Sequence, residues 1–344
     1  MTDGKARRII MTRYPEGMPD DEVLKLQSVP IPEPAEGEVL LRTIYLSLDP
    51  YMRGRMSPAK SYAAGVKPGE VVVGGTVAEV MESRNPGFAA GDIVLSGNGW
   101  QTHAVSDGIG LIKLDAAAAP LPYYLGVLGM PGYTAYIGLL SHGRPKAGDT
   151  LVVSAASGAV GQVVGQIGRI KGCRVVGIAG AADKCDYVTG ELGFDACVNY
   201  RDPDFAGKLK QACPDGIDIY FENVGGEVLK AVLPLLNDFA RIPVCGMIAH
   251  YNDNAAPEGP DRMPMLWRMI LTKRLSVRGF IVFDDISLQA DFVRDMAGWL
   301  KSGEVKYRID VVDGFENTVE AFQGLLTGRN RGKLVVKVGG EPGA

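Results

Sequence analysis

The sequence predicts an α/β protein that combines a doubly wound parallel sheet with a β-rich domain shaped as a partly open barrel. Three observations predict this fold class. Strand and helix patterns alternate from about 150 to 301, short strands with many turn residues occupy the first 120 residues, and a strand–helix–strand pattern returns after 305. With 344 residues, the chain is long enough for two domains.

The β-rich domain is predicted from short apolar runs that proline and glycine interrupt. The run over 71–80 contains two adjacent glycines, which indicates a bulge or a close approach of another chain segment. A helix over 131–140 leads into the second domain. Strands are expected at 8–12, 24–29, 39–46, 71–80, 91–95 and 101–105.

A strand, a glycine turn, a helix and a second strand follow one another over residues 150–180. Gly158 and Gly161 keep the spacing of the last two glycines in a dinucleotide-binding fingerprint. The first would let the backbone approach a pyrophosphate, and the second would let the helix pack closely on the strand. With Ala159 and Val160 they open a helix whose bare N–H groups can bind phosphate. The alternative is an ordinary crossover whose small residues serve packing alone.

The end of the second strand selects the cofactor. An NAD site usually places an acid there to hold the ribose 2′-OH, but Gly180 occupies this position and Lys184 follows one turn later. An uncharged strand end with a nearby cation favours NADP. Asp183 is an acid in the same region, and we interpret it as the cap of the next helix rather than a ribose ligand.

The rest of the second domain is predicted from alternating strand and helix patterns. The helix after the glycine turn carries Gly165 and Gly168, which offer a flat face to a sheet. Six strands interleaved with helices imply a parallel doubly wound sheet. Strands are expected near 151–154, 174–179, 196–199, 217–222, 241–245 and 276–282, with a tail of strand, helix and strand at 307–312, 316–326 and 333–338. Helices are expected near 159–171, 183–192, 204–212, 227–236 and 286–300.

Composition excludes several classes of protein. The apolar content of 46% and charged content of 22% are those of a soluble globular protein, and a net charge of −4 favours neither nucleic acid nor an anionic membrane. No apolar run has the length of a membrane span, and the N-terminus lacks the apolar core of a signal peptide. None of the five cysteines forms a Cys-x-x-Cys pair, which suits free thiols in the cytoplasm.

Several motifs resemble those of one enzyme family. The stretches 46–56 (LSLDPYMRGRM) and 126–136 (GVLGMPGYTAY), with 222–226 (ENVGG), 245–252 and 279–282, are similar to the zinc-independent medium-chain dehydrogenase/reductases. Within that family they resemble the leukotriene 12-hydroxydehydrogenase/prostaglandin reductase branch, and most of all its bacterial NADPH-dependent curcumin/dihydrocurcumin reductases. The resemblance covers nearly the whole chain.

The resemblance implies a fold and an activity. A GroES-like catalytic and substrate domain would comprise 1–130 and 305–344, a Rossmann domain binding NADPH or NADP⁺ would comprise 131–304, and the ligand cleft would lie between them. The family is usually homodimeric. Its members reduce the C=C bond of α,β-unsaturated ketones and aldehydes, which are small molecules.

The resemblance also implies cofactor contacts, residue by residue. The turn from Gly158 to Gly161 would hold the pyrophosphate, and Lys184 and Tyr200 the 2′-phosphate, although these two lie one residue further apart than in the leukotriene branch. The contacts to the ribose and nicotinamide would come from Asn223, Cys245, Gly246, Met247, Ile248, Tyr251, Phe280, Ile281, Val282 and Asn330.

A catalytic metal is not expected. Zinc-dependent relatives need Cys and His ligands in the first domain, and the first 130 residues hold no cysteine. The only histidines before residue 200 are His103 and His142. A Tyr-x-x-x-Lys pair is also absent from the sequence, so the short-chain reductase mechanism lacks its residues.

The remaining chemistry needs a hydrogen-bond donor for the negative charge that collects on the carbonyl oxygen when an enone accepts a hydride. A neutral phenol suits this role, and Tyr251 and Tyr51 are the candidates. The alternative for Tyr251 is a loop residue that packs on the nicotinamide ribose, and the alternative for Tyr51 is an aromatic residue that packs between the domains. Met130 and His250 are candidate substrate contacts. Core packing is the alternative for Met130, and for His250 a hydrogen-bonded loop residue is favoured over a proton donor. His250 occupies the position of a hydroxyl residue in the leukotriene branch. Residues 53 and 55, both arginine, are interpreted as a solvated or salt-bridged face.

Two other functions stay open at this point. A quinone reductase on the same fold would also accept a hydride from NADPH but would yield no saturated C=C product. A non-catalytic NADPH-binding protein would bind the cofactor without consuming it.

Overall fold

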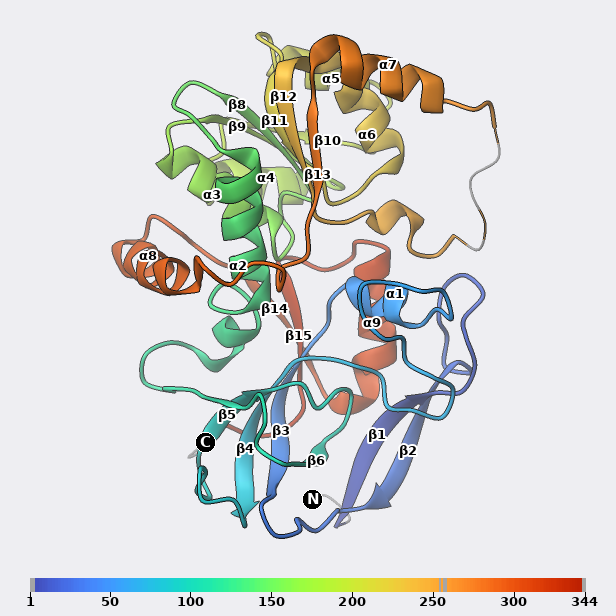
Figure 1. The fold of residues 1–344 in the computed structure, drawn as a ribbon, viewed down its shortest axis with the longest axis vertical. Coiled ribbons are helices and arrows are strands. Elements are labelled where there is room, and N and C mark those ends of the chain that lie inside the picture. Colours follow the sequence, from blue (N-terminus) through green and yellow to red (C-terminus); the bar gives the residue numbers. More distant parts are fainter. Residues whose placement is uncertain (1–3, 254, 256–258, 342–344) are drawn as a thin grey trace. The chain divides into compact units, whose positions relative to one another are not determined.

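The computed structural model describes residues 4–253, 255 and 259–341, and the chain divides into two compact units. The first unit contains the residues up to Leu125, then Ile309–Asn330 and the residues from Leu334. The second contains Gly126–Arg308 and Arg331–Lys333. Blue N-terminal strands and red C-terminal elements therefore belong to one unit in Figure 1. The ends of the expected first domain, 1–3 and 342–344, lie outside the described residues.

The first unit is a β-rich domain, as expected. Its main sheet has the order β14-β15-β3-β4-β5-β7, with β6 also paired to β3, and β1 and β2 form a separate antiparallel pair. The strands are β1 Lys5–Met11, β2 Leu24–Pro30, β3 Val39–Ser47, β4 Thr76–Ser83, β5 Ile93–Ser96, β6 His103–Ser106, β7 Ile112–Lys113, β14 Ile309–Asp313 and β15 Lys333–Lys337. The helices are α1 Tyr51–Arg55, α9 Thr318–Leu326 and the 3₁₀ segments Leu121–Leu125 and Phe315–Asn317.

The core of this unit joins both chain ends. Trp100 is fully buried and packs edge-on against Phe322 of α9, with ring centroids 5.2 Å apart. Met52 of α1 and Leu334 of β15 belong to the same cluster. The C-terminal strand–helix–strand segment therefore completes a hydrophobic core that the N-terminal residues begin.

The strand expected over 71–80 begins only at Thr76. A Cβ on Gly74 would lie 3.1 Å from side-chain carbons of both Leu46 and Trp100, so the chain approaches its neighbours closely here, as the glycine pair indicated. Val72 instead donates its N–H to Ile9 O at 3.1 Å and accepts the N–H of Trp100 at 2.8 Å. These bonds attach the segment around Val72 to β1 and Trp100, and it therefore does not extend β4 within the main sheet.

The second unit confirms the predicted doubly wound sheet. Its six strands are parallel, in the order β10-β9-β8-β11-β12-β13, which is the Rossmann order 3-2-1-4-5-6. The strands are β8 Thr150–Ser154, β9 Arg174–Ala179, β10 Ala196–Asn199, β11 Ile217–Phe221, β12 Leu236–Val244 and β13 Ser276–Gly279. The helices are α2 Met130–Ile137, continued by the π-helical segment Gly138–Gly143, α3 Gly161–Ile170, α4 Ala182–Gly190, α5 Phe205–Ala212, α6 Gly226–Val232, α7 Met263–Lys273 and α8 Gln289–Ser302, with 3₁₀ segments at Leu233–Leu235 and Ile248–His250.

Alternate strand residues face different helices. Val152 and Val176 belong to a cluster with apolar residues of α5, α6 and α7. Their neighbours Leu151 and Val175 lie next to Gly168 of α3, where a Cβ would come within 2.4 Å of Leu151 Cδ2. Figure 1 shows α3 in green and the yellow-to-orange α5, α6 and α7 on opposite sides of this sheet. The sheet is therefore covered on both faces, which explains its continuous apolar strands.

Two sequence expectations in this unit were wrong. The helix expected over 227–236 ends at Val232 as α6, because Pro234 lacks the N–H that an α-helix needs, and β12 already begins at Leu236. Helix α7 was not expected: Leu266, Met269 and Ile270 pack against the core from one face, but exposed apolar residues such as Trp267 and Leu271 occupy its other faces and hide the amphipathic pattern. No helix among the described residues is long and apolar enough to span a membrane.

Candidate active site

The glycine turn lies between β8 and α3. A Cβ on Gly161 would lie 2.3 Å from Ala155 O, so a glycine is needed for α3 to begin this close to the end of β8. This is the packing role that the sequence predicts. Gly158 donates its N–H to the same oxygen at 2.8 Å, and the half-exposed Ala159 and Val160 complete the turn. The sequence predicts that the backbone N–H groups at the start of α3 bind the pyrophosphate of a dinucleotide, and the turn leaves this helix end next to the end of β8.

Gly180 and Tyr200 come together at the end of β9. A Cβ on Gly180 would lie 2.9 Å from both Cε1 and Oη of Tyr200, so the phenol ring lies directly against the glycine backbone. The Tyr200 ring remains 38% exposed, and the guanidinium of Arg201 lies 5.7 Å from its centroid. Lys184 lies on α4, four residues after Gly180, and is half-buried. The strand end that carries an acid in NAD sites is here a glycine covered by a tyrosine.

Asp183 does not cap α4, so that interpretation was wrong. The N-cap residue is Ala181, without a side-chain cap bond, and Asp183 lies within the first turn. Its carboxylate instead pairs with Arg331 at 2.6 Å. The pair matters because it neutralises an acid close to the end of β9. Arg331 was not expected at this site, although the family resemblance selects the neighbouring Asn330.

Three segments meet at the carboxyl ends of β8, β11 and β12. Asn223 donates its backbone N–H to Ser154 Oγ and its side-chain amide to Ser154 O, both at 2.8 Å. Cys245 and Gly246 donate their N–H groups to Glu222 O at 2.9 and 3.1 Å. Asn223 O then accepts the N–H of Ile248, so Asn223 and the loop 245–251 form one hydrogen-bonded unit. This is the edge of a doubly wound sheet at which ligands bind.

The thiol of Cys245 is not a base or nucleophile at neutral pH. Burial, with a smaller effect from the nearby Glu222 carboxylate, raises the pKa of Cys245 to about 12. The thiol therefore stays protonated and offers this edge a compact, weakly polar surface.

His250 is held from both ring nitrogens. Its Nε2 accepts the N–H of Gly226 at 3.2 Å, and its Nδ1 lies 2.8 Å from Asp253 Oδ2. An accepting Nε2 places the ring proton on Nδ1, directed at the carboxylate. These contacts favour the hydrogen-bonded loop residue over the proton donor.

Tyr251 closes the same loop. Its phenol oxygen accepts the N–H of Met247 at 3.3 Å, and a Cβ on Gly246 would lie 3.0 Å from that oxygen. The phenol thus lies against the loop backbone, among four residues that the sequence selected for the cofactor. This position beside the loop backbone is compatible with both roles considered for Tyr251, packing on the ribose and donating a hydrogen bond to an oxyanion.

Phe280, Ile281 and Val282 follow the end of β13. The Phe280 ring is buried between Phe221 and His142, with centroids 6.3 and 5.1 Å away. Its side chain therefore packs in the core, and its backbone is the part that remains for a ligand. Met130 begins α2 and is half-buried.

The remaining candidates belong to the first unit. Tyr51 begins α1 and is half-buried; burial, with a smaller effect from Asp49, raises its pKa, so it remains a neutral phenol. Arg53 is 5% exposed and donates to Gly17 O at 2.8 and 3.1 Å, so of the solvated or salt-bridged face expected for the two arginines, the solvated alternative was wrong for Arg53. Arg55 is half-exposed, although its Nε is buried without a hydrogen-bond partner among the described residues.

Asn330 ends the last segment of the first unit before Arg331–Lys333, which belongs to the second. Within the second unit, Gly332 forms a parallel bridge with Gly158 of the glycine turn. The chain that follows Asn330 therefore lies beside the proposed pyrophosphate site.

No group of three His, Cys, Asp or Glu side chains that could hold a metal ion occurs among the described residues.

A β-rich unit with a Rossmann sheet and a glycine turn defines a nucleotide-dependent oxidoreductase of the medium-chain type. Residues 7–114 match the family described as the N-terminal domain of oxidoreductase, and residues 159–302 match the family described as zinc-binding dehydrogenase. The chain belongs to the medium-chain dehydrogenase/reductases, in their zinc-independent branch, with a GroES-like domain and a Rossmann domain.

Three relatives place it within that branch. The chain is 52% identical to the NADPH-dependent curcumin reductase of Escherichia coli over 97% of both chains. It is 42% identical to the NADP⁺-dependent 2-alkenal reductase of Nicotiana tabacum over 97% of this chain and 98% of the relative. The crystal structure of CurA from Vibrio vulnificus in complex with NADPH matches with a TM-score of 0.94 and 53% identity, over 97% of this chain and 100% of that one.

Proposed function

We propose that this protein is an NADPH-dependent reductase that saturates the C=C bond of α,β-unsaturated ketones and aldehydes. The 52% identity to a curcumin reductase over 97% of both chains carries the proposal. The 2-alkenal reductase and the NADPH complex of CurA support the same reaction class and the same cofactor.

The residues of the second unit fit NADPH. The close approach at Gly161 leaves the start of α3 to hold the pyrophosphate through backbone N–H groups. At the end of β9 the acid of an NAD site is replaced by Gly180, and the Asp183 carboxylate is paired with Arg331. Lys184 and Tyr200 would then hold the 2′-phosphate, by charge and by hydrogen bonding.

The ribose and nicotinamide would be held by the third part of the site. We assign these contacts to Asn223, to the loop 245–251 that it anchors, to the backbone at 280–282 and to Asn330. The many hydrogen bonds between Asn223, Glu222 and the loop hold this surface in one conformation before a ligand arrives. His250 is assigned a positioning role, because its ring nitrogens are bonded to Gly226 at the start of α6 and to Asp253.

The chain's own residues stabilise the charge that develops in the reaction. When bound, NADPH supplies the hydride that adds to the β-carbon of the substrate. The carbonyl oxygen gains negative charge in that step, and we assign Tyr251 the stabilising hydrogen bond, given directly or by fixing the ribose hydroxyl that donates it. Tyr51 and Met130 are proposed to bind the substrate, and solvent is proposed to protonate the α-carbon. The raised pKa keeps Tyr51 a donor at neutral and mildly alkaline pH.

A substrate panel tests the function. NADPH oxidation is followed with enones, enals, quinones and simple aldehydes, and the products are identified by mass spectrometry. Saturated ketones or aldehydes in amounts equal to the NADPH consumed support the proposal. Turnover of quinones alone would assign a quinone reductase, and NADPH binding without any consumption would assign a non-catalytic binding protein.

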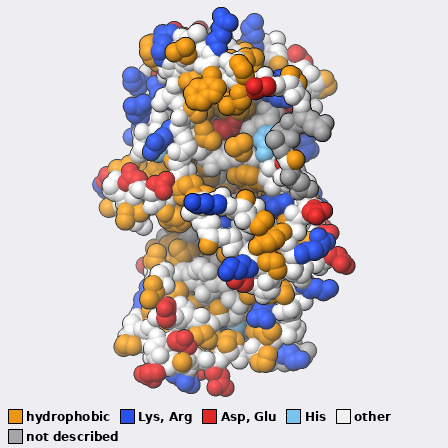
Figure 2. Space-filling view, turned by 45° about the vertical axis from the view of Figure 1, so that its right-hand side comes forward, with side chains coloured by type: hydrophobic (Ala, Val, Ile, Leu, Met, Phe, Trp, Pro, Cys, Tyr) orange, Lys and Arg blue, Asp and Glu red, His pale blue; other side chains and the backbone are white. Residues whose placement is uncertain are grey.

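We also propose that two copies pair through the β13 edge of the Rossmann sheet. Among the described strands, β13 ends the sheet, and all four of its residues are exposed. Helix α7 carries the exposed apolar side chains of Trp267 and Leu271, and Phe283 follows β13 in the chain; they are 61%, 77% and 73% exposed. Figure 2 shows apolar side chains gathered on the face that carries α7. A second copy would continue the sheet and cover this apolar surface.

Light scattering tests the pairing. Leu271 is 77% exposed on α7, and Leu271→Asp places a charge on the apolar surface that the second copy would cover. A dimer that this variant converts to monomer supports the proposal, and a monomeric unmodified chain refutes it.

We place the protein in the cytoplasm, because its five cysteines are all free thiols. Recovery of the protein in a secreted fraction would refute this location.

A further inference from the structure

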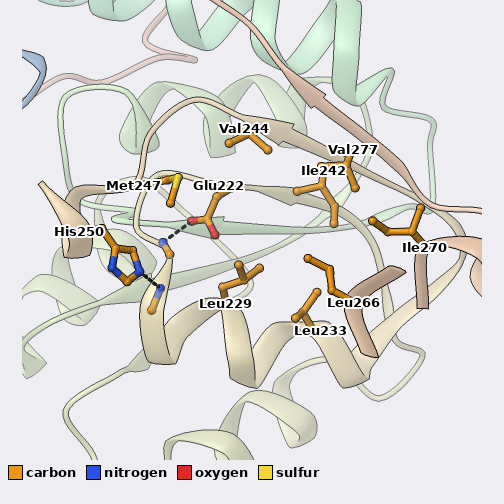
Figure 3. A pocket seen from close by; sticks show the side chains of 12 residues that line it. Glu222, Leu229, Leu233, Ile242, Val244, Met247, His250, Leu266, Ile270 and Val277 are labelled. Carbon is orange, nitrogen blue, oxygen red and sulfur yellow. Dashed lines mark hydrogen bonds between the residues drawn. The ribbon is translucent and has the colours of Figure 1, made fainter. Parts of the chain in front are cut away.

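A cavity lies within the Rossmann unit, between α6 and α7 and beneath β12 and β13. Its volume is about 140 Å³. Figure 3 shows its apolar walls, with Leu229 and Leu233 from α6 and its continuation, Leu266 and Ile270 from α7, and Ile242 and Val277 from the strands. One end is different, because the Glu222 carboxylate and the His250 ring lie there.

Among the described residues, one oxygen of the Glu222 carboxylate has no hydrogen-bond donor. Oε1 accepts the N–H groups of Val224 and Gly225 at 2.6 and 2.9 Å and the hydroxyl of Tyr220 at 2.9 Å. Oε2 is buried without a hydrogen-bond donor among the described residues, and the residue as a whole is only 2% exposed. In Figure 3 this second oxygen lies on the cavity side of the carboxylate, away from the dashed bonds. A buried carboxylate oxygen without a donor is costly, so the site suits a ligand that supplies one.

A single water molecule fits this end of the cavity poorly. A buried water typically needs two to four polar partners. The other polar side-chain atoms at the wall are already used, since Glu222 Oε1 accepts two backbone N–H groups and both His250 nitrogens are bonded. The fitting molecule therefore has one hydrogen-bond donor and an otherwise apolar body.

We propose that this cavity binds a small phenol, with the ring between α6 and α7 and the hydroxyl donating to Glu222 Oε2. An apolar protein cavity of about 150 Å³ holds one benzene molecule, so a single substituted ring matches the volume here. The apolar walls remove the ring from water, and the carboxylate selects the donor group. This site is separate from the glycine turn and from the Gly180 corner.

The bound phenol would communicate with the cofactor loop. Met247 and His250 line the cavity and also belong to the loop 245–251, which is proposed to contact the ribose and nicotinamide. Filling the cavity therefore changes how tightly this loop is held. The phenol alters the affinity for NADPH, and NADPH alters the affinity for phenol by the same factor, as linkage requires.

Calorimetric titration of the full chain saturated with NADPH tests the site, with phenol and its isostere toluene as probes. Glu222→Gln keeps an oxygen for the Val224 and Gly225 N–H groups but turns an amide toward the cavity. A neutral contact then replaces a charge-assisted one, and the affinity for phenol is expected to fall at least fivefold while that for toluene changes less than twofold. Equal losses for the two probes, or no heat with millimolar phenol, would overturn the proposal.

A second pair of variants protects the test against misfolding and against binding elsewhere. Leu229→Phe fills the cavity and should abolish binding of both probes, whereas Leu235→Phe makes the same change outside the cavity wall and should preserve it. Phenol binding that survives Leu229→Phe places the probe elsewhere and refutes the site. The readout is binding without turnover, so it stands or falls independently of the enone reductase activity.

Discussion

Replacing Lys184 by Ala should weaken NADPH binding and leave NADH binding unchanged. The side chain lies on α4, four residues after Gly180, whose backbone is covered by the Tyr200 ring. The Asp183 carboxylate beside it is paired with Arg331, so it does not repel a 2′-phosphate at full charge. The two cofactors differ only in that phosphate, so a contact made by Lys184 to it appears in one affinity and not in the other.

The size of the effect follows from the setting. A hydrogen bond between charged groups contributes about 1.5–3 kcal/mol, or roughly 10- to 150-fold in affinity. Lys184 is half-exposed, and solvent screening reduces such contacts. We therefore expect the low end, about a tenfold increase in the Kd for NADPH. Raising the salt concentration should reduce the preference further.

Fluorescence titration of each variant with NADPH and NADH measures the effect. Lys230→Ala is the matched control, because Lys230 is exposed on α6 and pairs with Glu227, away from the Gly180 corner. The reasoning is refuted if the unmodified chain binds both cofactors equally, or if Lys184→Ala weakens both by the same factor.

Four further predictions address chemistry, metal and packing. Tyr251→Phe should lower turnover by about 10²–10³-fold with a smaller change in NADPH affinity, and Tyr51→Phe should act mainly on KM; steady-state kinetics would contradict both roles if every parameter stayed within about twofold. Activity should survive chelators, and elemental analysis should find no stoichiometric zinc; one zinc per chain would reverse this view. Gly165→Ala should destabilise the Rossmann unit by about 1–3 kcal/mol in urea unfolding, because its Cβ would lie 1.8 Å from Phe194 Cζ; an unchanged midpoint would contradict the packing argument. Alkylation of Cys245 should stay slow from pH 6 to 9 and accelerate only toward pH 12, because its raised pKa keeps the thiol protonated below that value; rapid labelling at pH 7 would contradict the burial argument.

The nucleotide-binding half was predictable because its signals are local. A buried strand, a glycine turn and an amphipathic helix follow one another over 150–180, and each can be recognised from the pattern of a few neighbouring residues. The packing roles expected for Gly161 and Gly168 are confirmed, because a Cβ on either would lie only 2.3 or 2.4 Å from a neighbouring atom. Helix α7 was not expected because apolar residues such as Trp267 and Leu271 continue onto its exposed faces and obscure the stripe of Leu266, Met269 and Ile270 that packs against the core.

By itself, the amino-acid sequence determined the fold class, the alternation of strands and helices in a doubly wound sheet, the glycine turn and the absence of an acid at residue 180. Each of these depends on side-chain size, apolar period or backbone freedom at neighbouring positions. Only the tertiary structure decided that Asp183 pairs with Arg331, that both nitrogens of His250 are bonded, and that one oxygen of Glu222 faces an apolar cavity without a donor. These facts join residues 3 to 148 positions apart in the chain, and the energy of a polar contact depends on which groups the fold brings within about 3 Å, which local patterns do not encode.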